Sequence, residues 1–242
     1  MPIRHRFGLV SASVLAAMIE LQSPIAQAQS KIGVAATVSN QVEVGTRPLA
    51  AGNDVHANDR VRTGDAGAAQ LLFIDETSLS IGAKSDVTLD RFVYNPNRGT
   101  GSVVLSATRG AFRFVSGSQN PVNYTLKTPA ATIGVRGTVV QGQVGPTQST
   151  FYIVEGAVVW KGLTIPAGWA ITIYADGTYH GPYKYDSASI PGWGNMGKLE
   201  LPDGRNDLVD QLFGIDLRNQ PPAPPPCQGK CGNFRFGLGK PR

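Results

Sequence analysis

The sequence has few of the residues that build metal sites and reactive centres. Among its 242 residues are two cysteines, Cys227 and Cys231, and three histidines, of which His56 and His180 lie beyond the N-terminal region. A zinc site of the usual spacing needs a second Cys or His pair, which the sequence does not offer. It also has no Gly-x-Ser-x-Gly elbow, phosphate-binding glycine loop or calcium-loop spacing. We therefore expect no metal, no cofactor and no enzymatic activity, although a Ser-His-Asp set that uses either histidine stays arithmetically possible.

Long hydrophobic runs are also missing. Arg4 and Arg6 precede an apolar run at residues 8–19, which is shorter than the roughly 20 residues that a membrane-spanning helix needs. The small-residue triplet Ala26-Gln27-Ala28 that follows is typical of a signal-peptide cleavage site. We expect residues 1–28 to be a cleaved signal peptide, with an uncleaved anchor or a buried helix as the alternative. The mature chain would then be periplasmic or extracellular, with no transmembrane segment.

The excess of positive over negative charge is small as well. The formal net charge of +5 is mild, and the sequence has no dense Lys/Arg stripe with interleaved aromatic residues. Nucleic acid is therefore not an expected partner. In an oxidising exported compartment, the two cysteines at positions 227 and 231 are expected to form a local disulfide. Such a bridge would close a small loop and fix the tail without stabilising the core.

Turn residues and β-branched residues are abundant, with 29 Gly and 17 Pro. Short apolar segments, several with clear alternation, are separated by Gly, Asp, Asn or Pro. They lie at residues 33–38, 41–44, 60–63, 68–74, 79–82, 87–94, 103–107, 111–116, 124–128, 138–144, 150–154, 157–160 and 169–173. This spacing predicts an all-β fold, either a compact sandwich or barrel or a short β-solenoid of antiparallel strand pairs.

The composition changes near residue 180. We expect a β domain at 29–180, followed by an irregular extension at 181–220 that holds one short helix around 204–212. The proline-rich run at 221–226 predicts a stiff linker, and it begins a basic, cysteine-containing tail that extends to residue 242.

Two stretches look like variants of one hairpin. Residues 73–79 and 173–179 each place an acidic turn between apolar strands, and Asp176-Gly177 is the stronger turn signal because glycine adopts positive φ readily. This similarity is weak evidence of an internal repeat.

Several pieces of the sequence, taken in order, resemble the FecR domain family. The matching pieces are Val61-Arg62-Thr63-Gly64-Asp65, residues 69–79, Thr128-Pro129-Ala130-Ala131, Val135-Arg136-Gly137-Thr138, residues 154–158 and Pro166-Ala167-Gly168. The resemblance implies an all-β periplasmic or surface domain. The best-known members are membrane-spanning regulators that relay an outer-membrane iron-transport signal to a sigma factor. Because this sequence shows no cytoplasmic segment and no retained membrane helix, we expect a stand-alone exported module, a kind of protein generally taken to bind a ligand or partner.

The residues of the family pattern are expected to be structural. They are Arg62, Gly64, Asp65, Arg136, Gly137, Thr138, Gly156 and Gly168. Glycine permits close backbone approach or a bulge, and arginine can hydrogen-bond neighbouring carbonyl groups. The alternative is that an exposed Arg136 at a strand bend binds a carboxylate or phosphate.

The strongest binding signal is a concentration of aromatic residues between Trp160 and Trp193. The candidate ligand- or partner-binding residues are Trp169, Tyr174, Tyr179, Tyr183, Tyr185 and Trp193. Aromatic faces with a polar tip bind sugars and proteins well, but these residues could instead cover the open end of the β core. We expect a non-enzymatic module that contacts an envelope protein or polysaccharide. The alternatives are an adhesive surface protein that self-associates and a partner of an outer-membrane receptor in signalling.

Overall fold

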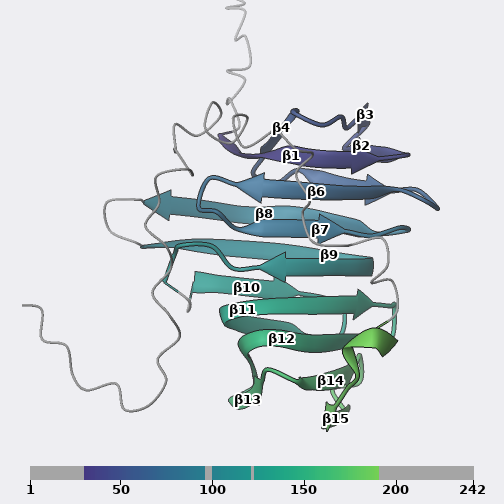
Figure 1. Ribbon diagram of the computed structural model, residues 1–242, viewed down its shortest axis with the longest axis vertical. Coiled ribbons are helices and arrows are strands. Elements are labelled where there is room, and N and C mark those ends of the chain that lie inside the picture. The colour runs from purple at the N-terminus through teal and green to yellow at the C-terminus, as the bar shows by residue number, and fades with distance from the viewer. Residues whose placement is uncertain (1–29, 96–99, 121–122, 191–242) are drawn as a thin grey trace, which may run out of the picture. The chain divides into compact units, whose positions relative to one another are not determined.

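The computed structural model describes residues 30–95, 100–120 and 123–190 (Figure 1). The chain divides into a unit at residues 1–30 and a unit that begins at Lys31, which contains all the described strands. Within the described residues, no helix is long and apolar enough to cross a membrane. The strands are β1 (Lys31–Ser39), β2 (Val42–Val44), β3 (Arg47–Pro48), β4 (Asp54–His56), β5 (Arg60–Thr63), β6 (Ala68–Phe73), β7 (Ser78–Ile81), β8 (Asp86–Asn95), β9 (Thr100–Val115), β10 (Tyr124–Lys127), β11 (Thr132–Val144), β12 (Gln148–Trp160), β13 (Leu163–Pro166), β14 (Trp169–Tyr174) and β15 (Tyr179–Lys184), and the 3-10 helix η2 (Ser187–Ser189) follows.

The strands form one sheet that contains two hydrogen-bonded ladders. Ladder A contains β3, β2, β5, β8, β9, β10, β11, β12 and β13 in that order, and ladder B contains β4, β1, β6, β7, β9, β11, β12, β14 and β15. Figure 1 shows the strands stacked from β1–β4, in purple, to β13–β15, in green. Because β4 pairs with β1 alone and β15 with β14 alone, the sheet is not closed into a barrel. The expectation of an all-β fold is confirmed, and the barrel form is not what is observed.

Three long strands belong to both ladders because each one bends at a glycine. β9, β11 and β12 bend at Gly110, Gly137 and Gly156, whose φ angles of 95°, 54° and 68° favour glycine. At Gly156, a Cβ atom would collide with the backbone carbonyl oxygen of Gly137. The bends therefore need residues without side chains, and they carry each strand from one ladder into the other.

The core lies between the two ladders. The ring of Phe73 in ladder B stacks on Phe92 in ladder A with 5.5 Å between centroids, and Phe114 meets Tyr124 edge-on at 5.6 Å. The alternating strands direct their apolar residues inward, as Phe112 and Phe114 of β9 show with exposures of 3% and 0%. Each such side chain contributes about 1.5–3 kcal/mol through burial.

Some strand predictions were wrong in their boundaries. The predicted pairs of strands at 103–107 and 111–116, and at 150–154 and 157–160, are single bent strands. β10 pairs in parallel with β9, so the strand pairs are not all antiparallel. β15 continues to Lys184, past the domain boundary expected at residue 180, because a register shift there accommodates Gly181 and Pro182 within the strand pair.

The two predicted hairpins have the same turn geometry, one residue out of the expected alignment. The amides of Phe73 and Tyr174 each donate to the carbonyl oxygen four residues later, at 2.9 Å. The amide of Thr77 donates to the Asp75 carboxylate at 3.0 Å, and that of Thr178 donates to Asp176 at 2.9 Å. Asp75 therefore corresponds to Asp176. Asp176 is exposed and its pKa is lowered by hydrogen bonds from Thr178, whereas Asp75 is fully buried.

Candidate binding surfaces of the β domain

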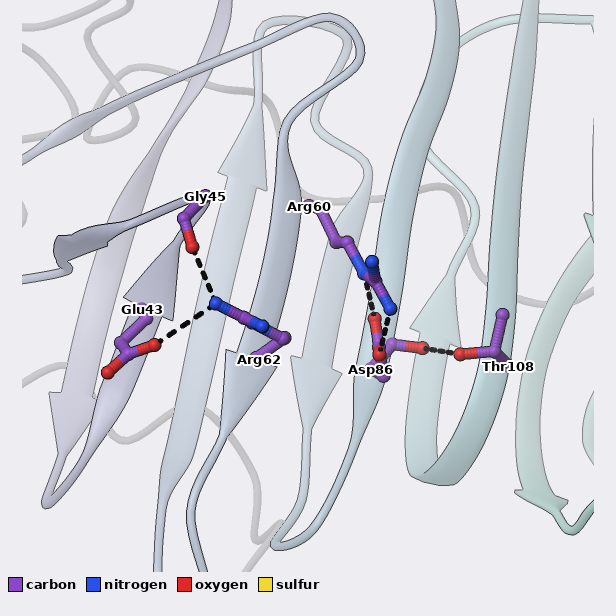
Figure 2. A network of polar contacts seen from close by, with 6 residues as sticks. All are labelled: Glu43, Gly45, Arg60, Arg62, Asp86 and Thr108. Atoms are coloured by element: carbon purple, nitrogen blue, oxygen red, sulfur yellow. Dashed lines mark hydrogen bonds and ion pairs between the residues drawn. The ribbon is translucent and has the colours of Figure 1, made fainter.

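Arg62 of the family pattern lies on the outer face of ladder A. Its guanidinium donates to the carbonyl oxygen of Gly45 at 2.7 Å and to the Glu43 carboxylate at 3.3 Å (Figure 2). Asp65 is 94% exposed and meets Lys84 at 3.9 Å, a contact of little energetic value. The contacts of Arg62 are all within the fold, which supports a structural role.

A second ion pair stands beside Arg62, and sequence reasoning missed it. Nε and one terminal nitrogen of Arg60 donate to the two carboxylate oxygens of Asp86 at 2.7 and 2.6 Å (Figure 2). The hydrogen bond from Arg60 lowers the pKa of Asp86, and burial opposes this shift. Thr108 adds a hydrogen bond to the Asp86 carbonyl oxygen at 3.2 Å. In sequence, no signal connects two residues that are 26 positions apart on β5 and β8.

The Arg136-Gly137-Thr138 signature forms the paired bend of β11 and β12. The Thr138 hydroxyl lies 2.6 Å from the carbonyl oxygen of Arg136 and 2.8 Å from that of Ala157, and it accepts from the Ala157 amide at 3.2 Å. Thr138 is 2% exposed, while the Arg136 side chain is exposed. One hydroxyl thus fastens both bent strands together.

Two further glycines of the pattern lie in turns. Gly64 donates its amide to the Gln41 carbonyl oxygen at 2.9 Å. Gly168 has a φ of 81° and donates to the Ile153 carbonyl oxygen at 2.8 Å. Both amides hold a turn against a neighbouring strand.

A buried polar cluster centres on Asp75, which the sequence indicates simply as part of a turn. One Asp75 carboxylate oxygen accepts from the Gln119 amide at 2.8 Å and from the Tyr124 hydroxyl at 3.0 Å. The Ser118 amide donates to the Asp75 carbonyl oxygen at 2.8 Å. Burial, together with the nearby Asp75, raises the pKa of Tyr124 to about 12, although a hydrogen bond with Thr77 opposes the shift. The cluster ties the segment between β9 and β10 to the β6–β7 turn.

The aromatic residues predicted to bind a ligand do not form a single patch. Residues that pair across strands point to the same face of a sheet. Tyr179 pairs with buried Ile173, and Lys184 pairs with Trp169, so these residues belong to the side of the core. Tyr183 pairs with Ala170 on the opposite, outer face of ladder B. The structure therefore divides the predicted patch into two surfaces.

The first surface, which we call the end cluster, consists of Trp160, Lys161, Trp169, Tyr179 and Lys184. The Tyr179 ring meets Trp160 edge-on at 5.1 Å, and the Lys161 ammonium lies 4.9 Å from the Trp160 ring centroid. The Lys184 ammonium lies 5.8 Å from the Trp169 centroid. Tyr179 remains 52% exposed. The end cluster closes the core at the last strands and also presents aromatic and cationic groups outward.

The second surface lies on the outer face of ladder B and contains Tyr152, Tyr183, Tyr185 and His180. Tyr152 and Tyr185 meet edge-on at 5.2 Å, and His180 lies 5.0 Å from Tyr183. Burial raises the pKa of Tyr152 and that of Tyr185. Tyr174 pairs with Gln148 at the margin of this face.

An open pocket of about 400 Å³ adjoins the second surface, and it is lined by Ala83, Gly110, Ala111, Gln143, Val144, Gly145, Gln148 and Thr150. Its walls offer amide and hydroxyl groups but none of the side chains that ordinarily act as acids, bases or nucleophiles apart from Thr150. The chemistry available there is hydrogen bonding. Trp193, Cys227 and Cys231, which the sequence indicates as a binding residue and a disulfide, lie outside the described residues.

The described residues thus form an all-β domain with two candidate binding surfaces, the end cluster and the outer face of ladder B around Tyr152 and Tyr183. Residues 59–159 match the FecR protein family. Residues 59–159 are therefore similar to the FecR family, and the resemblance based on the sequence motifs is confirmed over that range. The match ends one residue before Trp160, so the entire end cluster lies outside it.

The similarity of this chain to solved structures is low. Two crystal structures of a protein described as "a putative anti-sigma factor" from Parabacteroides distasonis, at 2.50 and 1.65 Å resolution, are similar to this chain. Each is 11% identical, covers 50% of this chain and 57% of that chain, and gives a TM-score of 0.39. The match thus spans little more than half of that protein. No curated protein matches the chain.

Proposed function

We propose that this protein is an exported, non-enzymatic binding module of a regulatory system, and that the end cluster is its contact surface for an envelope protein. The observation that carries this proposal is the exposure of Tyr179. A tyrosine that is 52% exposed and packed on Trp160 resembles the aromatic anchors of protein interfaces, and Lys161 and Lys184 add positive charge beside it.

The position of the cluster on β15 supports a protein partner over a polysaccharide. Among the described strands, β15 pairs with β14 alone, so one edge of its backbone offers unpaired donors and acceptors beside the aromatic rings. An extended segment of another protein can add to such an edge, while its side chains contact the anchors.

The test compares the purified protein with two variants in envelope extract from the source organism, using cross-linking and mass spectrometry. We expect Tyr179→Ala to lose the cross-linked partner that the wild type retains. Arg91→Ala, on the outer face of ladder A, should keep it. If every cross-linked protein is recovered equally with Tyr179→Ala, the end cluster is not the contact surface.

The open edges of the sheet favour one alternative function, self-association of an adhesive surface protein. β4 and β15 each have one unpaired edge among the described strands, and such edges can join copies of a chain. Light scattering at micromolar concentration distinguishes the two functions, because a monomer excludes self-association as the main role.

A further inference from the structure

A strip of uncharged polar residues crosses the outer face of ladder B beside the open pocket. Gln143 on β11 pairs with Thr150 on β12, and Thr150 pairs with Thr172 on β14. Thr172 pairs in turn with His180 on β15, which belongs to the second surface. Gln143 and Thr150 also line the pocket. The pocket and the second surface are therefore continuous parts of one face.

Three hydroxyl groups connect the pocket to the second surface. The Oγ1 atoms of Thr150 and Thr172 lie 2.9 Å apart, and the Tyr183 hydroxyl lies 3.2 Å from Oγ1 of Thr172. A hydroxyl can donate one hydrogen bond and accept two. The members of this chain therefore keep capacity for a further hydrogen bond to a ligand.

The pocket is hollow because half of its lining residues have little or no side chain. These residues are Ala83, Gly110, Ala111 and Gly145. At Gly110, a Cβ atom would collide with Ser85, and the φ of 95° favours glycine. The backbone at the bend of β9 thus keeps this part of the wall open. The volume of about 400 Å³ is within the usual range for small-molecule sites.

The polar groups of the pocket suit a neutral ligand with many hydroxyl groups. None of the described residues that line it carries a charge, so an anion would find no counter-charge in the lining. Gln143, Gln148 and Thr150 offer two side-chain amides and a hydroxyl. A glutamine amide both donates and accepts, so it can bind two adjacent hydroxyl groups of a sugar at once.

Aromatic rings lie beside these polar groups. Tyr174 is the direct cross-strand partner of Gln148 and so stands next to it on the outer face. Further along the strip, the His180 ring lies 5.0 Å from that of Tyr183. The C–H face of a sugar ring can pack on an aromatic ring while the sugar hydroxyls bind polar groups nearby. The four strands from β11 to β15 extend over about 14 Å, which suits a short chain of sugar units.

A peptide fits this face less well than a saccharide. In ladder B, β11 lies between β9 and β12, β12 lies between β11 and β14, and β14 lies between β12 and β15. Their backbone groups are paired on both sides, so an extended peptide has no strand edge to join there. Recognition on this face therefore depends on the side chains.

We propose that the pocket and the adjoining strip on the outer face of ladder B form a second binding site, and that its ligand is a neutral oligosaccharide. Gln143, Gln148 and Thr150 bind its hydroxyl groups, and Tyr174 and Tyr183 pack against its rings. The site is independent of the end cluster, because Tyr179 belongs to the opposite side of the same strands.

The test uses the full chain and saturation-transfer NMR. The probes are three neutral trisaccharides, maltotriose, cellotriose and tri-N-acetylchitotriose, and one anionic saccharide, trigalacturonic acid. Gln148→Ala removes an exposed amide from the pocket, and Thr150→Val removes its hydroxyl. Thr125→Val is the matched control, because it removes a hydroxyl from a half-buried threonine of β10 on the outer face of ladder A. Circular dichroism verifies that each variant keeps its strands.

We expect at least one neutral trisaccharide to bind, and its affinity to fall about tenfold in Gln148→Ala and in Thr150→Val. Thr125→Val and Tyr179→Ala should bind it as the wild type does. The proposal is overturned if none of the three neutral probes binds, if trigalacturonic acid binds more tightly than all of them, or if both pocket variants bind as well as the wild type.

Loss of saccharide binding in Tyr179→Ala would also overturn the proposal, since the sugar would then lie on the end cluster. Saccharide binding and cross-linking to an envelope protein are measured separately. Failure of this second site is therefore distinguishable from failure of the end cluster as a contact surface.

Discussion

The outer faces of the two ladders share three long strands, β9, β11 and β12, yet their side chains meet different surroundings. The face of ladder A has rows of charged groups, among them Glu43, Arg62, Asp86 and Arg109, which pair across strands, and of these Asp86 alone is buried. The face of ladder B has amides, hydroxyls and valines around a half-buried Arg113, and several of them, such as Gln141 and Val139, are buried. The charges of ladder A neutralise one another in contact with water, whereas the uncharged groups on the face of ladder B are suited to hydrogen bonds with a neutral partner.

This difference shows what alternation in a sequence can and cannot predict. A strand that switches between apolar and polar residues has one core face, but the polar face need not be exposed. Glutamine and serine can make hydrogen bonds to another layer of protein at little cost, while charged groups resist burial. Whether the polar residues of a strand are charged or uncharged therefore helps to predict whether their face is buried. A hydrophobic pattern alone does not distinguish the two kinds.

The largest expected effect comes from placing a charge at a buried position on the outer face of ladder B. Gln141→Lys would bury an ammonium group beside Arg113, and we expect a loss of about 2–3 kcal/mol in the free energy of unfolding. Thr125→Lys, on the open face of ladder A, should change it by less than about 0.5 kcal/mol. Urea-induced unfolding followed by tryptophan fluorescence measures both. Equal losses of unfolding free energy in the two variants would show that the two outer faces do not differ in burial.

A smaller effect is expected from removing two methyl groups on each face. Val139→Ala, at a buried position on the outer face of ladder B, should cost about 1.5 kcal/mol through lost burial. Val104→Ala, half-buried on the outer face of ladder A, should cost about 0.5 kcal/mol, mainly through lower strand propensity. The difference in the free energy of unfolding between the two variants, measured in urea, gives the additional contribution of burial on the outer face of ladder B. A larger loss for Val104→Ala would contradict the assignment of the faces.

Much of the fold could be predicted from local pattern, because alternation over residues 87–93 and 111–116 identifies the core face of each strand. That β9, β11 and β12 each continue through a bend could not be predicted in this way. Gly110 and Gly156 resemble turn residues in sequence, and their role as bends depends on contacts with Ser85 and with the Gly137 carbonyl group. Such contacts connect residues that are distant in the chain.

The sequence indicated which residues form the candidate site, but not how the strands arrange them. The density of aromatic residues after Trp160 drew attention to β14 and β15, but strict alternation along β15 would place Tyr179 and Tyr183 on one face, whereas the observed pairing places them on opposite faces. The register shift in β15 then brings His180 and Tyr183 to the same face, which simple alternation would not predict. The role of Asp75 was missed because its partners Gln119 and Tyr124 are 44 and 49 positions away.

The smallest expected effect concerns the charged network on ladder A and its dependence on pH. Because hydrogen bonds from Arg60 lower the folded-state pKa of Asp86 below its ordinary value of 3.8, the network stabilises the folded state above that pH. The stability is lost as the pH falls from 3.8 through the lower, folded-state pKa. We expect Asp86→Asn to flatten the fall of the urea midpoint in this range, while Asp65→Asn, at a carboxylate that is 94% exposed, leaves it as in the wild type. Added salt should reduce the effect only slightly, since Arg60 contacts both carboxylate oxygens directly. An unchanged pH profile in Asp86→Asn would mean that the paired charges of ladder A contribute no more to stability than its exposed ones, and that the two outer faces differ in burial alone.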